Sequence, residues 1–322
     1  MRVLRREFLG SVAALAATSA FPPGALALAT HDFASEPLYP SADLSYFDTP
    51  ITPAPSEIHF GYAAITWGGD DRQAIEDIGS LGFPGIQLRS NCIEEFKNPT
   101  ALRDLLVEHK LRFVALSSGD LDPDPALEAQ QIALHTAHAE FLKKAGGFYL
   151  QVTDRRPPGH DITETDCKRL AKLLTKLGRR IADLGISLGY HNHMGSRGEH
   201  PQGVEWIMES VDPRYARLEL DIAHYLEGGG DPVAAIEKFS DRLLFFHIKD
   251  VERLHGGHEP FRFVELGRGS VNLPAVFDAL RKINFRGWAI VELDAVPDKA
   301  RTPKESAVIS KNYLQEKLNQ RI

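Results

Sequence analysis

Cysteine is scarce in this chain. Only Cys92 and Cys167 occur among 322 residues, so the sequence lacks the disulfide framework with which small secreted domains compensate for a small core. Hydrophobic residues make up 43% of the chain, which is enough for a substantial core without such cross-links. Neither cysteine lies near a histidine-rich segment. We therefore expect both to be ordinary core or surface residues and not metal ligands.

A long apolar run is also missing. The apolar stretch at residues 8–20 is short and rich in alanine, whereas a membrane-spanning helix needs roughly 20 apolar residues. Arg5 and Arg6 precede it, and an Ala-Leu-Ala pattern follows at 25–29, which is typical of a cleavable signal. The paired arginines followed by Phe-Leu resemble a twin-arginine export signal. We expect a signal peptide at 1–29, an extended leader at 30–55, no stable membrane anchor, and a periplasmic or secreted protein.

The chain has fewer basic residues than acidic ones, 37 against 44. The formal net charge is −7, and loss of the signal peptide would remove three arginines and one glutamate, which makes it −9. A protein with this charge is repelled by nucleic acids and by anionic membranes. We therefore expect a small-molecule partner and no nucleic acid, while a homo-oligomer remains compatible with the sequence.

The glycine-rich turn of dinucleotide-binding folds is absent as well. The first predicted strand, 58–65, is followed by Thr-Trp-Gly-Gly-Asp, with no G-x-G-x-x-G motif. A doubly wound open sheet usually carries that motif after its first strand. Its absence disfavours this fold.

What the sequence does contain is a regular alternation of short apolar runs and helical patterns. Eight strand-helix units lie within about 265 residues, close to the roughly 250 residues of a typical (β/α)8 barrel. The pattern predicts an α/β fold, a single-domain (β/α)8 TIM barrel over residues 56–322. The predicted strands are 58–65, 85–88, 112–116, 147–152, 187–190, 217–220, 243–248 and 288–291. The predicted helices are 72–81, 99–109, 125–145, 163–184, 203–210, 232–239, 273–283 and 303–318.

Helix boundaries carry recognisable signals. Glycine after a helix supplies the left-handed backbone of a stop signal, and Asx-Pro is typical of a helix start. The predicted stops are Gly82, Gly146, Gly185 and Gly287, and the predicted starts are Asn98-Pro99, Asp124-Pro125 and Asp231-Pro232.

Metal-binding side chains gather at the ends of the last four strands. A TIM barrel builds its active site at the carboxyl ends of its strands, and alternate side chains of a strand share a face. A site of imidazole and carboxylate ligands suits manganese, cobalt, iron, nickel or zinc. It suits magnesium less well, because magnesium prefers oxygen ligands alone. The groups at these ends are His191, His193, Glu219, Asp221, His224, His247, Lys249 and Glu292.

Five segments together resemble one family. They are 188–195 (LGYHNHMG), 220–224 (LDIAH), 246–251 (FHIKDV), 265–270 (ELGRGS) and 289–293 (AIVEL). They resemble the xylose isomerase-like superfamily of TIM barrels, also labelled sugar phosphate isomerase/epimerase, and especially the inosose dehydratase-like branch with a Tyr-His-Asn-His strand. The resemblance covers most of residues 56–320.

This resemblance implies a divalent metal held by one residue from each of strands five to eight. Asp221, His247 and Glu292 match the last three ligands. His191 stands where many relatives have glutamate, so His191, His193 or a water completes the set. Manganese is the expected ion, with cobalt, zinc, iron, nickel and magnesium as alternatives.

The implied chemistry is enolisation of an unphosphorylated keto-carbohydrate through a metal-stabilised enediolate, in an isomerase or epimerase-like enzyme. We expect His193 or Glu219 as base and Lys249 as acid or electrophile. Glu219 could instead orient a ligand histidine, and Lys249 could form a structural ion pair with Asp250 or Asp221. The expected substrate-binding residues are His224, Arg268, Trp67 and Gln151.

Gln151 also bears on the reaction. Relatives that shuttle a proton between two glutamates have one on strand four, where this chain offers only Gln151. A lyase, dehydratase or hydratase acting on a keto-sugar, inosose or 3-keto-glycoside is therefore the close alternative. A non-catalytic sugar-binding barrel is the alternative of another class, and a metal-dependent phosphodiesterase conflicts with the negative charge.

Overall fold

The computed structural model describes residues 58–157, 159–254 and 260–322. The predicted signal peptide at 1–29 and leader at 30–55 lie outside the described residues and stay predictions. Within the described part, no helix combines the length and the apolarity that crossing a membrane requires.

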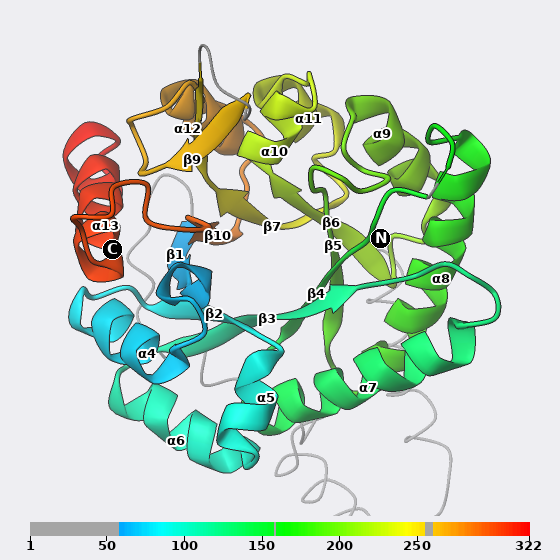
Figure 1. The fold of residues 1–322 in the computed structure, drawn as a ribbon, viewed down its shortest axis with the longest axis horizontal. Helices are drawn as coiled ribbons and strands as arrows, with labels where there is room; N and C mark the ends of the chain where they lie inside the picture. Colours follow the sequence, from blue (N-terminus) through cyan, green and yellow to red (C-terminus); the bar gives the residue numbers. More distant parts are fainter. Residues whose placement is uncertain (1–57, 158, 255–259) are drawn as a thin grey trace, which may run out of the picture. The chain divides into compact units, whose positions relative to one another are not determined.

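Eight parallel strands close into a barrel in the order β1-β10-β7-β6-β5-β4-β3-β2, with the helices outside it (Figure 1). The prediction of a single (β/α)8 barrel is confirmed. Each predicted strand overlaps an observed one, with ends that differ by up to four residues. The barrel strands are β1 Ile58–Ala63, β2 Gly85–Arg89, β3 Arg112–Asp120, β4 Tyr149–Thr153, β5 Ser187–His191, β6 Ala216–Asp221, β7 Leu243–Ile248 and β10 Gly287–Val291.

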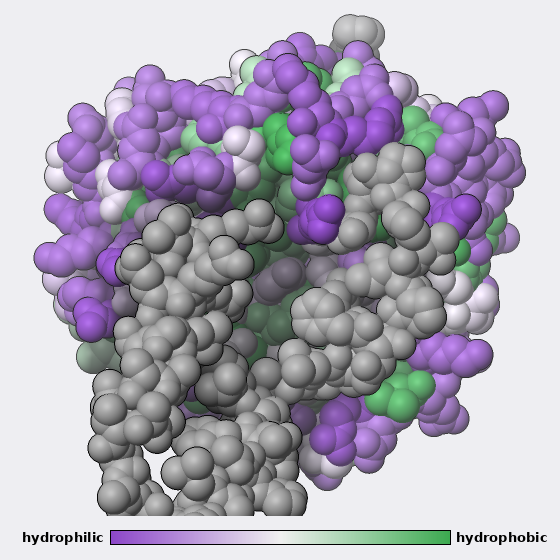
Figure 2. Space-filling model, turned by 180° about the vertical axis from the view of Figure 1, so that it is seen from behind, coloured by the Kyte–Doolittle hydropathy of each residue, from purple (hydrophilic) through white to green (hydrophobic). Residues whose placement is uncertain are grey.

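The outer ring contains the eight predicted helices. Where the view from behind shows described residues, the surface over the ring is mostly hydrophilic, with hydrophobic residues visible toward the middle (Figure 2). The helices are α4 Asp71–Ser80, α6 Pro99–Glu108, α7 Glu128–Lys144, α8 Glu164–Ala182, α9 Pro201–Ser210, α11 Pro232–Lys238, α12 Leu273–Lys282 and α13 Pro303–Asn312.

Most boundary signals act as expected. Gly82, Gly146 and Gly185 have φ values of 83°, 83° and 73°, in the left-handed region that favours glycine. The side chains of Asn98 and Asp231 accept hydrogen bonds from the first turns of α6 and α11.

One stop signal and two helix ends were predicted wrongly. Gly287 is the first residue of β10, and Asn284, with φ 52°, takes the left-handed position after α12. α7 begins at Glu128 and not at Pro125, because the Asp124 side chain accepts from the Ala126 amide and closes a separate turn. α13 ends at Asn312, and the chain continues as a π turn over Tyr313–Lys317 and not as regular helix to residue 318.

The core fills both the barrel and the layer between strands and helices. α8 shows the pattern clearly: Leu170, Leu174, Leu177 and Ile181, spaced three or four apart, are all fully buried. Cys92 and Cys167 are buried free thiols, as expected of core residues.

Several short elements were not predicted from the sequence. They are too short to show a periodicity, and they lie in loops at strand ends. They are the 3-10 turn Ala64–Trp67, α5 Asn91–Phe96, α10 Ile222–Glu227, and the antiparallel hairpin of β8 Asp250–Arg253 and β9 Phe261–Val264.

Asp250 anchors this hairpin to the rest of the barrel. Its buried carboxylate accepts four backbone N–H bonds, from Val251 at 2.9 Å, Gly267 at 3.0 Å, Gly269 at 2.9 Å and Val271 at 3.0 Å. Bonds to a charged acceptor are stronger than neutral ones, so Asp250 ties the start of β8 to the loop at residues 267–271 that precedes α12. It also follows Lys249 directly and so limits where that side chain can point.

We predict that Asp250→Asn lowers the free energy of unfolding by about 2 kcal/mol, because an amide nitrogen cannot accept the N–H bonds that a carboxylate oxygen accepts. Thermal unfolding of the purified protein measures this. Asp241→Asn is the control, since Asp241 is 76% exposed and makes only a surface ion pair. Equal melting temperatures for Asp250→Asn and the control would contradict the anchoring role.

Candidate metal centre

The four predicted ligands converge at one end of the barrel. In the register of the sheet, His191 on β5 lies beside Glu219 on β6, and Asp221 on β6 lies beside His247 on β7. Glu292 follows β10 and donates its backbone N–H to Ile248 of β7. One ligand atom from each of four buried side chains lies within 4.8 Å of the others, and these residues are His191, Asp221, His247 and Glu292.

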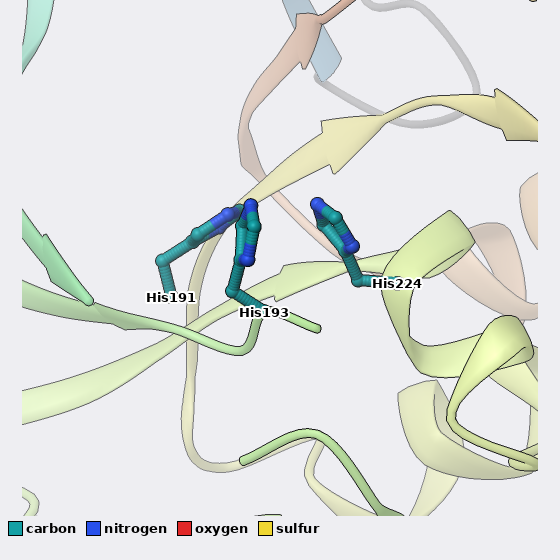
Figure 3. Close-up of side chains that lie close together, drawn as sticks. All are labelled: His191, His193 and His224. Carbon is teal, nitrogen blue, oxygen red and sulfur yellow. The ribbon is translucent and has the colours of Figure 1, made fainter. Parts of the chain in front are cut away.

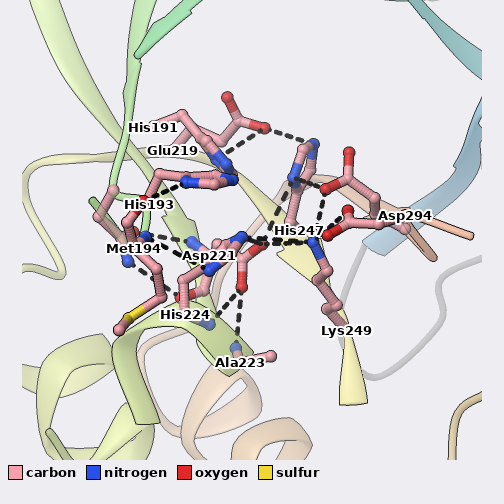
Figure 4. A network of polar contacts seen from close by, with 12 residues as sticks. His191, His193, Met194, Glu219, Asp221, Ala223, His224, His247, Lys249 and Asp294 are labelled. Carbon is pink, nitrogen blue, oxygen red and sulfur yellow. Dashed lines mark hydrogen bonds and ion pairs between the residues drawn. The ribbon is translucent and has the colours of Figure 1, made fainter. Parts of the chain in front are cut away.

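Asp221 is oriented by the helix that follows it. Its Oδ1 caps α10, accepting from the amides of Ala223 at 2.9 Å and His224 at 2.8 Å (Figure 4). This leaves Oδ2 without a hydrogen-bond partner among the described residues. The cap therefore fixes the carboxylate and keeps its second oxygen available to the centre.

His247 is oriented from its opposite side. Its Nε2 lies 2.6 Å from Glu219 Oε1 and 3.0 Å from Gln87 Oε1, two acceptors that favour a proton on this nitrogen. Its Nδ1 faces Glu292 at 3.3 Å and Asp221 at 3.7 Å. Burial opposes a charge on this ring, but Glu219 and Glu292 outweigh burial and raise the pKa of His247 well above its ordinary value, so a metal ion bound at Nδ1 would take the place of a proton. A metal-binding histidine is typically held in this way by a carboxylate on its other nitrogen.

Asn192 ties two of the strands together. Its Oδ1 accepts from the Asp221 amide at 2.9 Å, and its Nδ2 donates to the Asp221 carbonyl at 3.1 Å. This buried pair of bonds joins the end of β5 to the end of β6. It therefore helps to fix the spacing between His191 and Asp221.

Lys249 is fully buried and surrounded by acceptors. Its Nζ lies 2.6 Å from Asp294, 3.0 Å from Glu292, 3.3 Å from His224 Nε2 and 3.8 Å from Asp221. Burial opposes its charge, but Asp294 and Glu292 outweigh burial and raise the pKa of Lys249 above its ordinary value. Lys249 is therefore protonated in this site.

The remaining titrations follow from the same balance of burial and charge. Burial raises the pKa of Glu219 to about 7, although His247 opposes the shift. Burial would raise the pKa of Asp221 too, but His224 and Lys249 overcome it and hold that pKa below its ordinary value. Burial and the neighbouring His247 lower the pKa of His191 well below 6.5, so His191 is neutral and its lone pair is available.

These side chains fit a divalent metal. Three buried carboxylates, Glu219, Asp221 and Glu292, share the site with the Lys249 ammonium and the partly buried Asp294, and buried negative charge in excess requires a compensating cation. Ligand atoms of three of the four proposed residues lack a hydrogen-bond partner among the described residues. They are His191 Nδ1, Asp221 Oδ2 and His247 Nδ1. Two imidazoles and two carboxylates are a donor set suited to zinc, manganese, iron or cobalt.

A second group of metal-capable side chains shares His191. The rings of His191, His193 and His224 converge (Figure 3), and one nitrogen of each lies within 4.8 Å of the others. His193 is only partly buried, and its Nδ1 lies 2.6 Å from the Met194 carbonyl, to which it donates. Its Nε2 therefore carries the lone pair in a neutral ring. Both His191 and His193 remain candidates for the first ligand.

The predicted substrate-binding residues lie in different places. His224 adjoins the centre through Lys249 and Asp221. Gln151 is buried on β4, and its Oε1 has no partner among the described residues. Trp67 packs edge-on against Tyr62 and donates its indole N–H to Asp77 at 2.9 Å, which is the pattern of a core residue.

Arg268 lies in a separate cavity, half exposed and 3.7 Å from Glu265. That cavity, of about 550 Å³, contains none of the four proposed ligands. It is lined by Glu252, Arg262, Val264, Glu265, Arg268, Pro297, Asp298, Lys299 and Arg301.

Four residues of the site received no role from the sequence. Gln87 and Asp294 stand at the ends of the second and eighth strands and were therefore recognisable as candidates by position. Asn192 lies between two histidines, but nothing in the sequence shows what it bonds. Phe263 places its ring 4.0 Å from Lys249 Nζ, and no signal in the sequence indicates the hairpin that carries it.

Comparison with known proteins gives consistent results for sequence and for structure. The inosose dehydratase of Lacticaseibacillus casei is 27% identical over 300 residues, covering 81% of this chain and 98% of the relative. That of Clostridium tetani is 26% identical over 301 residues, covering 81% and 97%. In both cases the match extends over nearly the whole relative.

Among solved structures, the IOLI protein with a bound zinc atom matches with a TM-score of 0.70 at 19% identity, covering 80% of this chain and 97% of that one. A D-allulose 3-epimerase from Methylomonas sp. matches with a TM-score of 0.65 at 22% identity, covering 81% and 98%. These two structures show the shared fold. The family model for the xylose isomerase-like TIM barrel matches residues 75–315, and the chain belongs to that family.

Proposed function

We propose that this chain is a divalent-metal enzyme that removes a proton beside the ketone of an unphosphorylated keto-carbohydrate and then expels a β-substituent, as a dehydratase or related lyase does. The observation that carries the proposal is the buried cluster of two histidines and two carboxylates with unpartnered ligand atoms beside Lys249. The inosose dehydratase relatives support a carbohydrate substrate.

The proposed ligands are His191, Asp221, His247 and Glu292. A bound divalent cation supplies a Lewis acid that stabilises negative charge developing on the oxygens of a carbonyl substrate. The structure favours no particular ion over the others.

The proton-transfer roles follow from accessibility and charge. His193 is partly exposed and presents Nε2, so it can take the proton from the carbon beside the ketone. Lys249 holds an ammonium proton that it can give to the departing hydroxyl or alkoxyl oxygen, which leaves as water or alcohol. Glu219 touches the His247 nitrogen that faces away from Asp221 and Glu292, so orientation of His247 suits it better than acting as base.

Epimerisation is the second candidate, and one observation bears on it. The solved structures of similar fold include sugar 3-epimerases. A two-base epimerase needs a second proton donor across the substrate, and β4 offers Gln151, an amide that does not exchange protons in this way. Elimination therefore suits this site better.

We predict that Asp221→Asn removes the metal. The amide oxygen can still cap α10, but the substitution removes the negative charge at Oδ2. The metal content, measured by elemental analysis after gel filtration, should fall from about one equivalent per chain to near zero. Asp231→Asn is a matched control, because Asp231 caps α11 in the same way and is exposed. Full occupancy in Asp221→Asn would contradict the proposed centre.

We predict that His193→Gln slows proton removal by a factor of about 10²–10⁴, the usual contribution of a general base. The measurement is deuterium incorporation from D₂O into an inosose or keto-hexose, followed by NMR, with the metal content checked in parallel. His109→Gln, at the end of α6, is the control.

The same experiment separates the alternatives. An ultraviolet-absorbing enone or a released alcohol supports elimination. Deuterium exchange that yields only the epimeric sugar supports epimerisation instead. No exchange with any ketose or keto-glycoside would support a non-catalytic sugar-binding barrel.

We also propose export by the twin-arginine route, on which the preference for an unphosphorylated substrate depends. Replacing Arg5 and Arg6 together by lysine is expected to leave the protein in the cytoplasm, because the paired arginines are the signal that the export machinery reads. Cell fractionation of the full chain measures this, with Arg2→Lys as control. Unchanged export of the double variant would refute the proposal.

A further inference from the structure

A cavity of about 490 Å³ lies between β9 and the segment that follows β10. Its volume falls within the roughly 300–1,000 Å³ typical of small-molecule sites. We call it the hairpin cavity. It is lined by Pro260, Phe261, Arg262, Phe263, Asp294, Ala295, Val296 and Pro297.

The hairpin cavity adjoins the candidate metal centre. Its Phe263 ring lies 4.0 Å from Lys249 Nζ, and its centroid lies 4.8 Å from that of His224. Its Asp294 accepts from Lys249 Nζ at 2.6 Å. A substrate held beside Lys249 would therefore be next to the cavity, so that a substituent on it could enter.

The walls of the hairpin cavity are mainly apolar. Phe261 and Phe263 are two residues apart on β9, which puts them on one face of the strand, and their ring centroids are 5.5 Å apart. The opposite wall consists of Ala295, Val296 and Pro297. Both phenylalanines are only partly buried within the described structure.

Charge in the lining is largely neutralised. Arg262 pairs with Glu252 at 2.8 Å, and as the residue between the two phenylalanines it lies on the other face of β9. Asp294 is paired with Lys249. An apolar group that entered the cavity would cover aromatic and aliphatic surface without stripping water from an unpaired charge.

We propose that the hairpin cavity binds an apolar aromatic substituent carried by the carbohydrate substrate, while the carbohydrate ring lies at the metal centre. This inference rests on the proposed function, because it takes the substrate of that same site to be an aryl-substituted sugar. A bare sugar is polar around its edge and leaves Phe261 and Val296 in water. An aryl group attached to it packs against both walls.

The test compares the binding of phenyl β-D-glucopyranoside and methyl β-D-glucopyranoside to the full metal-loaded protein, by calorimetry or by saturation-transfer NMR. Neither compound is a ketone, so the readout needs no turnover. We expect the phenyl glycoside to bind about tenfold more tightly, the scale of discrimination that an apolar pocket provides. Equal affinities would overturn the proposal.

Two substitutions on opposite walls locate the effect. Phe261→Ala and Val296→Ser should each reduce the phenyl-over-methyl preference severalfold, and the second stands if the first fails to fold. Phe263 is avoided because it also contacts Lys249 and His224. Leu134→Ala on α7 and Val107→Ser on α6 are matched controls, 46% and 68% exposed and absent from the cavity lining, and should keep the full preference. An unchanged preference in both cavity variants would overturn the assignment.

Failure of the subsite and failure of the proposed chemistry give different results. A phenyl preference that depends on Phe261 and Val296, without deuterium exchange on any keto-sugar, supports the subsite and refutes the enolisation. Exchange on an unsubstituted keto-sugar, without any phenyl preference, supports the enolisation and refutes the subsite.

Discussion

Burial of negative charge is the constraint around which the carboxyl end of this barrel is built. Glu219, Asp221, Glu292 and Asp294 lie close together, and in the described structure Lys249 is the ammonium that contacts three of them. Removing carboxylates from water costs several kcal/mol each unless cations compensate. The two histidines, each with an unpartnered Nδ1 in the described structure, suit compensation by a metal ion better than by further lysines or arginines.

The hydrogen bonds that orient the proposed ligands keep their metal-binding atoms available. Two of the four proposed ligands use one polar atom for structure and leave the other for the centre. Asp221 caps α10 with Oδ1 and keeps Oδ2 free, while His247 faces Glu219 with Nε2 and keeps Nδ1 free. Fixed side chains of this kind lose little entropy when a ligand binds, which is the usual source of affinity in preorganised sites.

The sequence predicted the barrel and the convergence of the candidate ligands for a physical reason. Alternation along a strand and the placement of TIM-barrel sites are local rules, so Asp221, His247 and Glu292 could be assigned one face and one end of the barrel from their positions alone. The contact between His247 and Gln87 joins residues 160 positions apart, and the register of the barrel decides it. No pattern within either segment reveals it.

The hairpin of β8 and β9 is a part of the fold that could not be predicted from the sequence. β8 and β9 have four residues each, which is too short for a usable periodicity, and they pair with each other antiparallel. Asp250 stabilises this hairpin, and the hairpin in turn places Phe263 against Lys249. Asp250, a possible ion-pair partner of Lys249 on the sequence alone, is thus a structural anchor, and Lys249 contacts Asp294, Glu292 and Asp221 instead. Because one short hairpin both places a ring against the ammonium and forms an apolar wall beside it, the proposed subsite predicts that a change in this hairpin alters the groups that a substrate can carry without altering the metal ligands.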